Sequence, residues 1–307
     1  MLADSWRLRI GGLVRHAREY SLADLMNRKD RRDSAVTIEC SGNIPDPRIM
    51  NGLVSNAIWT GIPLGAVLDE CGVSPEAREV VFLGLDAEPD KKWEAGNAEY
   101  LSPHGYSIFV QDAQSGPLLA FAMNGRPLTP EHGFPLRLVL PGWYGMAQVK
   151  WLTRIELTDR RYEGRHMARN YQSLRALKTG DETVWLDTSI SRNNLKSVVA
   201  RVTRRRVDGK PVYRISGAAW GGPTAIRTIE VRIDDGSWQT ARIEERHGDA
   251  AWLLWSFDWS SAVPGPHTLV SRAINTRGEI QPTRDELRDR LISNREDNSQ
   301  WPRPLTL

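Results

Sequence analysis

The chain has 307 residues, 40% hydrophobic and 26% charged, with a formal net charge of +3. This length allows two domains with separate cores, and the near-balanced charge favours neither nucleic acid nor a membrane surface as a partner. No apolar run reaches the roughly 18 residues of a membrane span, and no export signal is present, so the chain as written is expected to be cytoplasmic, or periplasmic if its N-terminus is truncated.

The chain contains two cysteines, Cys40 and Cys71. Two cysteines are too few for a disulfide scaffold, and these are too far apart for a Cys-x-x-Cys metal clip. We therefore expect no structural zinc.

The first elements are a strand and a short helix. Residues 6–14 alternate apolar and basic side chains and break at Gly11-Gly12, which is typical of a half-buried strand entering a turn. Ser21 precedes an apolar stretch and is the predicted N-cap of a helix.

The run Val36-Thr37-Ile38-Glu39 predicts a strand that stops at Cys40, and Ser41-Gly42-Asn43 predicts a turn. A cysteine at such a position could be a thiolate metal ligand or a nucleophile. It could equally be a small buried hydrophobe, as isolated cysteines often are. The residues alone leave both readings open.

A loop must follow the turn, because Pro45 and Pro47 each remove a backbone donor. Apolar residues then recur at helical spacing from Leu64 to Cys71, and Gly72 ends the pattern, so Cys71 is predicted to be helix packing. Residues 80–85 form an apolar run of strand length that leads to Asp86.

Basic residues and glycines gather around the next strands. An apolar strand is predicted over 118–123 with a turn at Asn124-Gly125, and further β segments over 136–140 and 149–152. His132, Arg137 and Lys150 lie on or beside these segments, with Gly142 and Gly145 between them. They could form an anion site suited to phosphate, or be ordinary surface charges on strand edges.

The pattern changes after Tyr171. Residues 181–196 are predicted to be a polar linker, and from Ser197 onward short alternating strands recur with Asp-Gly and Pro-Gly turns. This spacing is typical of an immunoglobulin-like β-sandwich. Its many tryptophans are expected in the core or at a subunit interface.

Several long motifs closely resemble the sulfite oxidase family of molybdenum enzymes: residues 37–43 (TIECSGN), 55–64 (SNAIWTGIPL), 84–86 (GLD), 123–137 and 149–152, and in the C-terminal half 215–222, 235–238 and 278–282. The resemblance implies an α+β fold, with a sulfite-oxidase-type molybdopterin-binding catalytic domain over residues 1–180. An immunoglobulin-like dimerisation domain would follow over 190–307, so a homodimer is expected.

The resemblance also implies the site. Cys40 would be the protein thiolate on molybdenum, held with one molybdopterin per subunit, and a soft thiolate suits such a metal. Tyr171 would be the substrate-pocket tyrosine. Arg48 is a further catalytic candidate only as the nearest arginine after the turn, since the family's own arginine positions are Ile44 and Pro45 here. The implied cofactor-binding residues are Ser55, Asp86, His132, Arg137, Gln148, Val149 and Lys150.

The implied activity is two-electron oxo transfer between molybdenum and a small oxyanion or sulfur substrate such as sulfite. No Cys-x-x-Cys-His motif occurs, so we expect no haem in this chain and an external electron carrier such as a cytochrome. Sulfite oxidases carry an arginine pair after the cysteine turn, where this chain has Ile44 and Pro45. Two alternatives are therefore a sulfoxide reductase-type activity and a cofactor-free binding or assembly protein that retains the fold.

Overall fold

The computed structural model describes residues 3–46, 48, 51–89 and 101–307. The chain forms two compact units that are interleaved in sequence. Unit 1 comprises Met1–Val36, Ala57–Gln172 and Ser189–Ser191, and unit 2 comprises Thr37–Asn56, Ser173–Thr188 and Arg192–Leu307. The domain boundaries predicted from the sequence, 1–180 and 190–307, stay a prediction. The compact units are divided differently, because residues 37–56 belong to unit 2.

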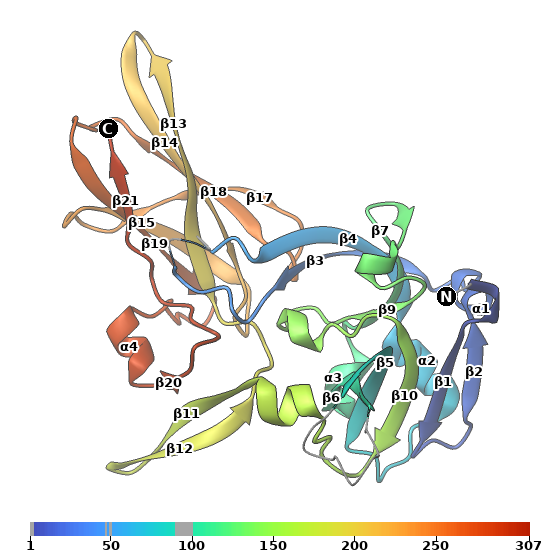
Figure 1. The fold of residues 1–307 in the computed structure, drawn as a ribbon. Helices are drawn as coiled ribbons and strands as arrows, with labels where there is room; N and C mark the ends of the chain where they lie inside the picture. Colours follow the sequence, from blue (N-terminus) through green and yellow to red (C-terminus); the bar gives the residue numbers. More distant parts are fainter. Residues whose placement is uncertain (1–2, 47, 49–50, 90–100) are drawn as a thin grey trace. The chain divides into compact units, whose positions relative to one another are not determined.

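Unit 1 contains a five-stranded sheet with the order β2-β1-β10-β5-β6 (Figure 1). Its strands are β1 (Arg7–Gly12), β2 (Arg18–Ser21), β5 (Glu79–Pro89), β6 (Leu101–Phe109) and β10 (Leu152–Thr158). β1 and β10 are parallel and the other neighbours are antiparallel. The predicted first strand is confirmed, and it ends at Gly12, whose φ of 80° lies in the region that favours glycine.

A second sheet has the order β3-β4-β7-β8, and β9 also pairs with β7. Its strands are β3 (Arg32–Glu39), β4 (Val54–Pro63), β7 (Leu118–Met123), β8 (Arg126–Pro127) and β9 (Arg137–Val139). The chain passes from unit 1 to unit 2 within β3, after Val36, and returns within β4, after Asn56. The cysteine turn therefore belongs to unit 2.

The helices of unit 1 are short. They are α1 (Leu22–Met26), α2 (Leu64–Cys71) and α3 (Val110–Gln114), with 3-10 turns η1 (Ala3–Ser5), η3 (Pro130–His132) and η4 (Gly145–Ala147) and a π-helical turn η5 (His166–Asn170). Ser21 caps α1 in a capping box with Asp24, as its position predicted. The predicted helix at 64–71 is confirmed, and it ends at Gly72 in a left-handed conformation.

The core of unit 1 lies between α2 and the five-stranded sheet. Leu64, Val67 and Leu68 of α2 are fully buried in one cluster with Leu8 and Ile10 of β1. Because these residues recur at helical spacing, they lie on one face of α2, and this face packs into the core. The same face contains Cys71, which is buried and free, so its predicted packing role is confirmed.

Unit 2 contains a β-sandwich of two four-stranded sheets, β13-β14-β18-β17 and β16-β15-β19-β21 (Figure 1). The strands are β13 (Lys196–Val207), β14 (Lys210–Trp220), β15 (Ile226–Ile233), β16 (Gln239–Thr240), β17 (Arg242–Arg246), β18 (Leu253–Trp259), β19 (Pro266–Asn275) and β21 (Arg303–Thr306). Trp255 and Trp259 are buried in its core with Ile215 and Leu269. The predicted sandwich is confirmed, as is a core role for these tryptophans.

The predicted polar linker over 181–196 is wrong for most of its length. β11 (Gln172–Thr179) and β12 (Glu182–Ser189) pair around Gly180, whose φ is 62°, and β20 (Leu291–Ile292) pairs with β11. Most side chains of β12 are exposed, so its sequence lacks the apolar alternation of a half-buried strand. A short helix, α4 (Arg284–Arg288), precedes β20. No helix in the described ranges is both long enough and apolar enough to cross a bilayer.

Gly217 of β14 provides a stability test of the sandwich. A Cβ atom at this position would collide with the carbonyl oxygen of Val198 and with the buried ring of Trp255. Since neither group can move freely, we expect Gly217→Ala to lower the free energy of unfolding by about 1–3 kcal/mol, as overpacked cores do. Urea denaturation followed by tryptophan fluorescence measures this change.

Gly11→Ala is the matched control, because a Cβ there would meet only the Glu156 carboxylate at an ordinary 3.5 Å. Equal stability losses for the two variants would contradict the packing described for Trp255.

Candidate functional site

The predicted site residues fall in both units. Unit 2 contains Cys40, Arg48 and Ser55, and unit 1 contains Asp86, His132, Arg137, Gln148, Val149, Lys150 and Tyr171.

Cys40 follows directly after β3 and its side chain is exposed. Its backbone N–H donates to the Leu53 carbonyl at 2.9 Å, and its own carbonyl accepts from the Asn43 N–H at 2.9 Å. The backbone is thus held while the sulfur is open, so the reading of Cys40 as a buried hydrophobe is wrong. A Cβ atom on Gly42 would lie 3.7 Å from Sγ, which means that a side chain there would fill the space beside the sulfur.

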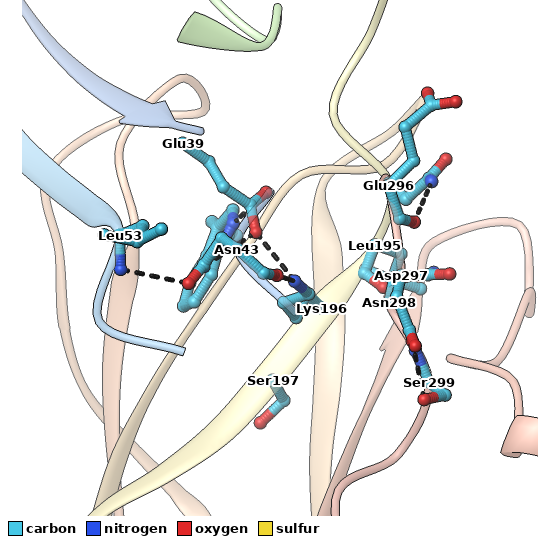
Figure 2. Close-up of polar contacts among 12 residues, drawn as sticks. Glu39, Asn43, Leu53, Leu195, Lys196, Ser197, Glu296, Asp297, Asn298 and Ser299 are labelled. Atoms are coloured by element: carbon cyan, nitrogen blue, oxygen red, sulfur yellow. Dashed lines mark hydrogen bonds and ion pairs between the residues drawn. The ribbon is translucent and has the colours of Figure 1, made fainter. Parts of the chain in front are cut away.

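A buried polar network holds the two residues that flank the turn (Figure 2). Lys196 Nζ lies 2.8 Å from Glu39 Oε1 and donates to the Asn43 carbonyl at 2.6 Å. Asn43 Nδ2 donates to Glu39 Oε1 at 3.0 Å, and the Trp220 indole N–H donates to Glu39 Oε2 at 2.9 Å. The Lys196 and Glu39 side chains are 2% and 0% exposed. Each charge is therefore compensated out of contact with water.

A C-terminal segment holds the turn from another direction. The Glu296 N–H donates to the Ser41 carbonyl at 2.7 Å, and the Glu296 backbone adopts a φ of 57°. Asn194 Nδ2 donates to the Glu296 carbonyl at 3.0 Å, and Arg175 pairs with the Glu296 carboxylate at 2.6 Å. Burial raises the pKa of Glu296, and the nearby Arg175 opposes that rise. The turn is thus fixed on both sides of Cys40.

Arg48 and Ser55 are both exposed. Arg48 forms two side-chain hydrogen bonds with the Asp46 carboxylate, at 3.0 and 2.8 Å, and this pairing raises the pKa of Arg48. Its charge is therefore partly neutralised within its own loop. Ser55 lies on β4.

In unit 1, Arg137 is buried and binds the backbone of two loops. Its Nη1 donates to the His132 carbonyl at 3.0 Å and its Nη2 to the Gln148 carbonyl at 3.2 Å. The guanidinium lies 4.7 Å from the centre of the Trp59 ring. Burial lowers the pKa of Arg137 to about 10, so the group stays charged at neutral pH. Arg137 brings together the loops that contain His132 and Gln148.

His132 and Lys150 are the more accessible donors of these loops. His132 Nδ1 lies 2.8 Å from Thr129 Oγ1, and Lys150 Nζ donates to the Glu131 carbonyl at 3.0 Å. Lys150 makes no ion pair within the part of the chain that the structure describes. Lys150 precedes β10 rather than lying on a strand, because Trp151 adopts a left-handed φ of 47°.

Gln148 and Val149 are buried. Gln148 Oε1 accepts from the Leu140 N–H at 2.7 Å, while its Nε2 donates to the Leu140 and Trp143 carbonyls. The Val149 carbonyl accepts from the Leu138 N–H at 2.8 Å. These two residues hold the loop after η4 against β9, which supports the position of Lys150.

Tyr171, Asp86 and two histidines form a second group in unit 1. The His166 and His104 ring centres are 4.7 Å apart, and those of His166 and Tyr171 are 6.2 Å apart. Burial lowers the pKa of His166, and His104 adds to this effect, while Asp86 weakly opposes it. Within the described residues, His166 Nδ1 is buried without a hydrogen-bond partner. His166 is therefore a neutral ring at pH 7 with an unused polar atom.

Four residues of these groups are not among the site residues predicted from the sequence: Glu39, Lys196, His104 and His166. Glu39 carried a signal, since it is an acid that ends a run of β-branched residues, and such a residue needs a partner if the strand is buried. Lys196 is 157 residues away from Glu39, and its sequence surroundings carried no such signal.

No group of three or more His, Cys, Asp or Glu residues suited to a metal occurs in the described ranges. A site with a single protein thiolate would not need such a group.

Two family models match the chain. Residues 1–166 match the oxidoreductase molybdopterin binding domain, and residues 187–294 match the Mo-co oxidoreductase dimerisation domain. The chain belongs to the sulfite oxidase family of molybdopterin-binding oxidoreductases. The resemblance read from the sequence is confirmed, as is the predicted fold class.

The chain spans between about a third and about half of the length of two curated relatives that it matches. Human mitochondrial sulfite oxidase is 32% identical over 91% of this chain and 54% of its own length. Inducible NADH nitrate reductase 1 of Glycine max is 27% identical over 89% of this chain and 34% of its own length. The crystal structure of the sulfane dehydrogenase SoxCD from Paracoccus pantotrophus covers 100% of this chain and 77% of that chain, with 27% identity and a TM-score of 0.80.

The buried ion pair predicts a large effect of removing one partner. Lys196→Met leaves the Glu39 carboxylate buried without its cation, so we expect the free energy of unfolding to fall by about 3–5 kcal/mol. Urea denaturation measures this loss of stability.

The double variant Glu39→Gln/Lys196→Met removes both charges and should recover most of the loss. If the double variant is no more stable than Lys196→Met, the two charges do not compensate each other in the folded protein.

The His166 environment predicts a pH dependence. Because the folded pKa is lower than the unfolded value of about 6.5, the unfolded chain binds the proton first as the pH falls. Stability should therefore decrease as the pH is lowered through and below about 6.5, with no contribution from this group above it. The melting temperatures of the wild type and of His166→Gln are compared at each pH between 5 and 8. The difference between them is the contribution of His166 to the pH dependence of stability. Identical pH profiles would refute the buried, neutral assignment.

Proposed function

We propose that the protein is a molybdenum-molybdopterin oxidoreductase that carries out two-electron oxo transfer with a small, sulfite-like sulfur substrate. The observation that carries this proposal is the exposed Cys40 sulfur on a turn whose backbone is fixed on both sides. The match of residues 1–166 to a molybdopterin binding domain supports it.

The residues present fit such a cofactor. Cys40 offers a soft sulfur donor of the kind that such a metal takes, and Gly42 leaves room beside it. Lys150 and His132 offer cationic and N–H donors of the kind that bind phosphate, on loops that Arg137 holds in place. When bound, the cofactor would supply the oxo-transfer and redox chemistry, and the protein would hold it and shape its surroundings.

Asp86, Gln148, Val149, Ser55 and Tyr171 remain in the proposal as predicted from the family, and Arg48 remains as the nearest arginine after the turn. Gln148 and Val149 would act through the loop that they hold, since their hydrogen bonds are made to neighbouring backbone. Tyr171, beside the His166 ring, is the proposed substrate-pocket residue.

Arg48 bears on the choice of substrate. Its guanidinium is bound by Asp46, so it attracts an oxyanion less strongly than an unpaired arginine would. Ile44 and Pro45 add no charge at the preceding positions. This combination favours, as a second candidate, a less charged oxo acceptor or donor such as a sulfoxide. A cofactor-free binding or assembly protein is the third.

Electrons would leave to an external carrier such as a cytochrome. The C-terminal sandwich would form a homodimer, which the match of residues 187–294 to a dimerisation domain supports.

The proposal predicts stoichiometric molybdenum that depends on Cys40. After expression in a host that makes the cofactor, Cys40→Ser should lose most of the metal measured by mass spectrometry and all sulfite-dependent reduction of an artificial electron acceptor. Cys71→Ser is the matched control. Because Cys71 is buried on α2, the Cys71→Ser protein should keep its molybdenum. A wild type free of molybdenum and pterin would instead support the assembly protein.

Steady-state assays with sulfite, nitrate and a sulfoxide then choose among substrates. Rapid turnover of sulfite supports the first candidate. Turnover restricted to the sulfoxide supports the second.

A further inference from the structure

The Lys196 side chain contacts both ends of the turn that contains Cys40. Its Nζ lies 2.8 Å from the carboxylate of Glu39, the residue before the cysteine, and 2.6 Å from the carbonyl of Asn43, three residues after it (Figure 2). Lys196 begins β13 of the sandwich. A single ammonium group thus spans the turn and ties it to the sandwich within unit 2.

The Glu39 carboxylate is held as firmly as the ammonium. Its Oε1 accepts from Lys196 and Asn43, and its Oε2 accepts from the Trp220 indole at 2.9 Å. Trp220 is buried at the end of β14, which pairs with β13 and places Trp220 opposite Lys196. Because the donors come from paired strands and from the turn itself, the turn cannot rotate without breaking several charge-assisted hydrogen bonds at once.

Stability alone does not account for this pair. A buried ion pair gains little over well-packed apolar side chains of similar volume, and its best-attested use is to select one arrangement over others. Here the arrangement that it selects is the backbone on either side of the cysteine. The hydrogen bonds of this network all end on the Glu39 carboxylate or the Asn43 carbonyl, and none of them involves the Cys40 sulfur.

We propose that Lys196, with Glu39, is a positioning pair that fixes the direction of the Cys40 sulfur toward its metal. This inference rests on the proposed function in that the metal is the one proposed above. The pair acts through the backbone of the turn and contacts neither substrate nor metal. Its loss should therefore change how the sulfur is presented more than whether the protein folds.

The test uses the double variant Glu39→Gln/Lys196→Met, which leaves no unpaired buried charge. The control is Glu230→Gln/Arg272→Gln, which removes a pair with a 2.6 Å separation between β15 and β19, on the other sheet of the sandwich. Both variants and the wild type are prepared as full chains, with and without the cofactor.

Two readouts are made. Hydrogen exchange of the cofactor-free protein follows the amides of Cys40 and Asn43, which bond to Leu53 and to Cys40. They should exchange about tenfold faster or more in the double variant, as expected for losing the hydrogen bonds that restrain the turn, and at the wild-type rate in the control. In the loaded protein, the electron paramagnetic resonance signal of the molybdenum centre should shift or split in the double variant alone, and kcat should fall more than KM rises.

The outcomes separate the two claims. An unchanged resonance signal and kcat in a molybdenum-loaded double variant overturn the positioning role, even if its melting temperature falls. A wild type that binds no molybdenum overturns the proposed function. In that case, faster exchange at Cys40 and Asn43 still supports control of the turn by the pair, and unchanged exchange overturns it.

Discussion

The buried ion pair between Glu39 and Lys196 is the interaction on which the cysteine turn depends. It joins the end of β3 to the beginning of β13, and the Asn43 carbonyl and Trp220 indole complete its hydrogen bonds. Two charges removed from water must be compensated in a fixed geometry. The same geometry leaves the Cys40 side chain exposed on a hydrogen-bonded backbone, as the proposed role of a single thiolate ligand requires.

In unit 1 a different buried cation has a comparable task. Arg137 donates to backbone carbonyls at His132 and Gln148, and so fixes the loops on which His132 and Lys150 lie. The Arg137 guanidinium holds the loop backbones, while the more accessible Lys150 carries a charge that forms no ion pair within the described part of the chain. In each unit, a buried cation thus binds backbone carbonyls close in sequence to a more accessible side chain: Lys196 beside Cys40, and Arg137 beside His132 and Lys150.

Much of the fold could be predicted because its signals are local. The helix ending at Gly72, the cap at Ser21 and the alternating strands of the sandwich each depend on neighbouring residues, and long motifs indicated the family. Strand β12 was missed because most of its side chains are exposed and it lacks apolar alternation. The partner of Glu39 could not be predicted, since Lys196 is 157 residues away and no local pattern connects them.

X-ray absorption at the molybdenum edge of the loaded protein shows whether Cys40 binds the metal, because it counts the sulfur atoms bound to molybdenum. If the fixed turn presents Cys40 as a ligand, molybdenum in the wild type will show one more sulfur contact per metal atom than the molybdenum that Cys40→Ser retains. Equal sulfur counts in the two proteins would contradict the account.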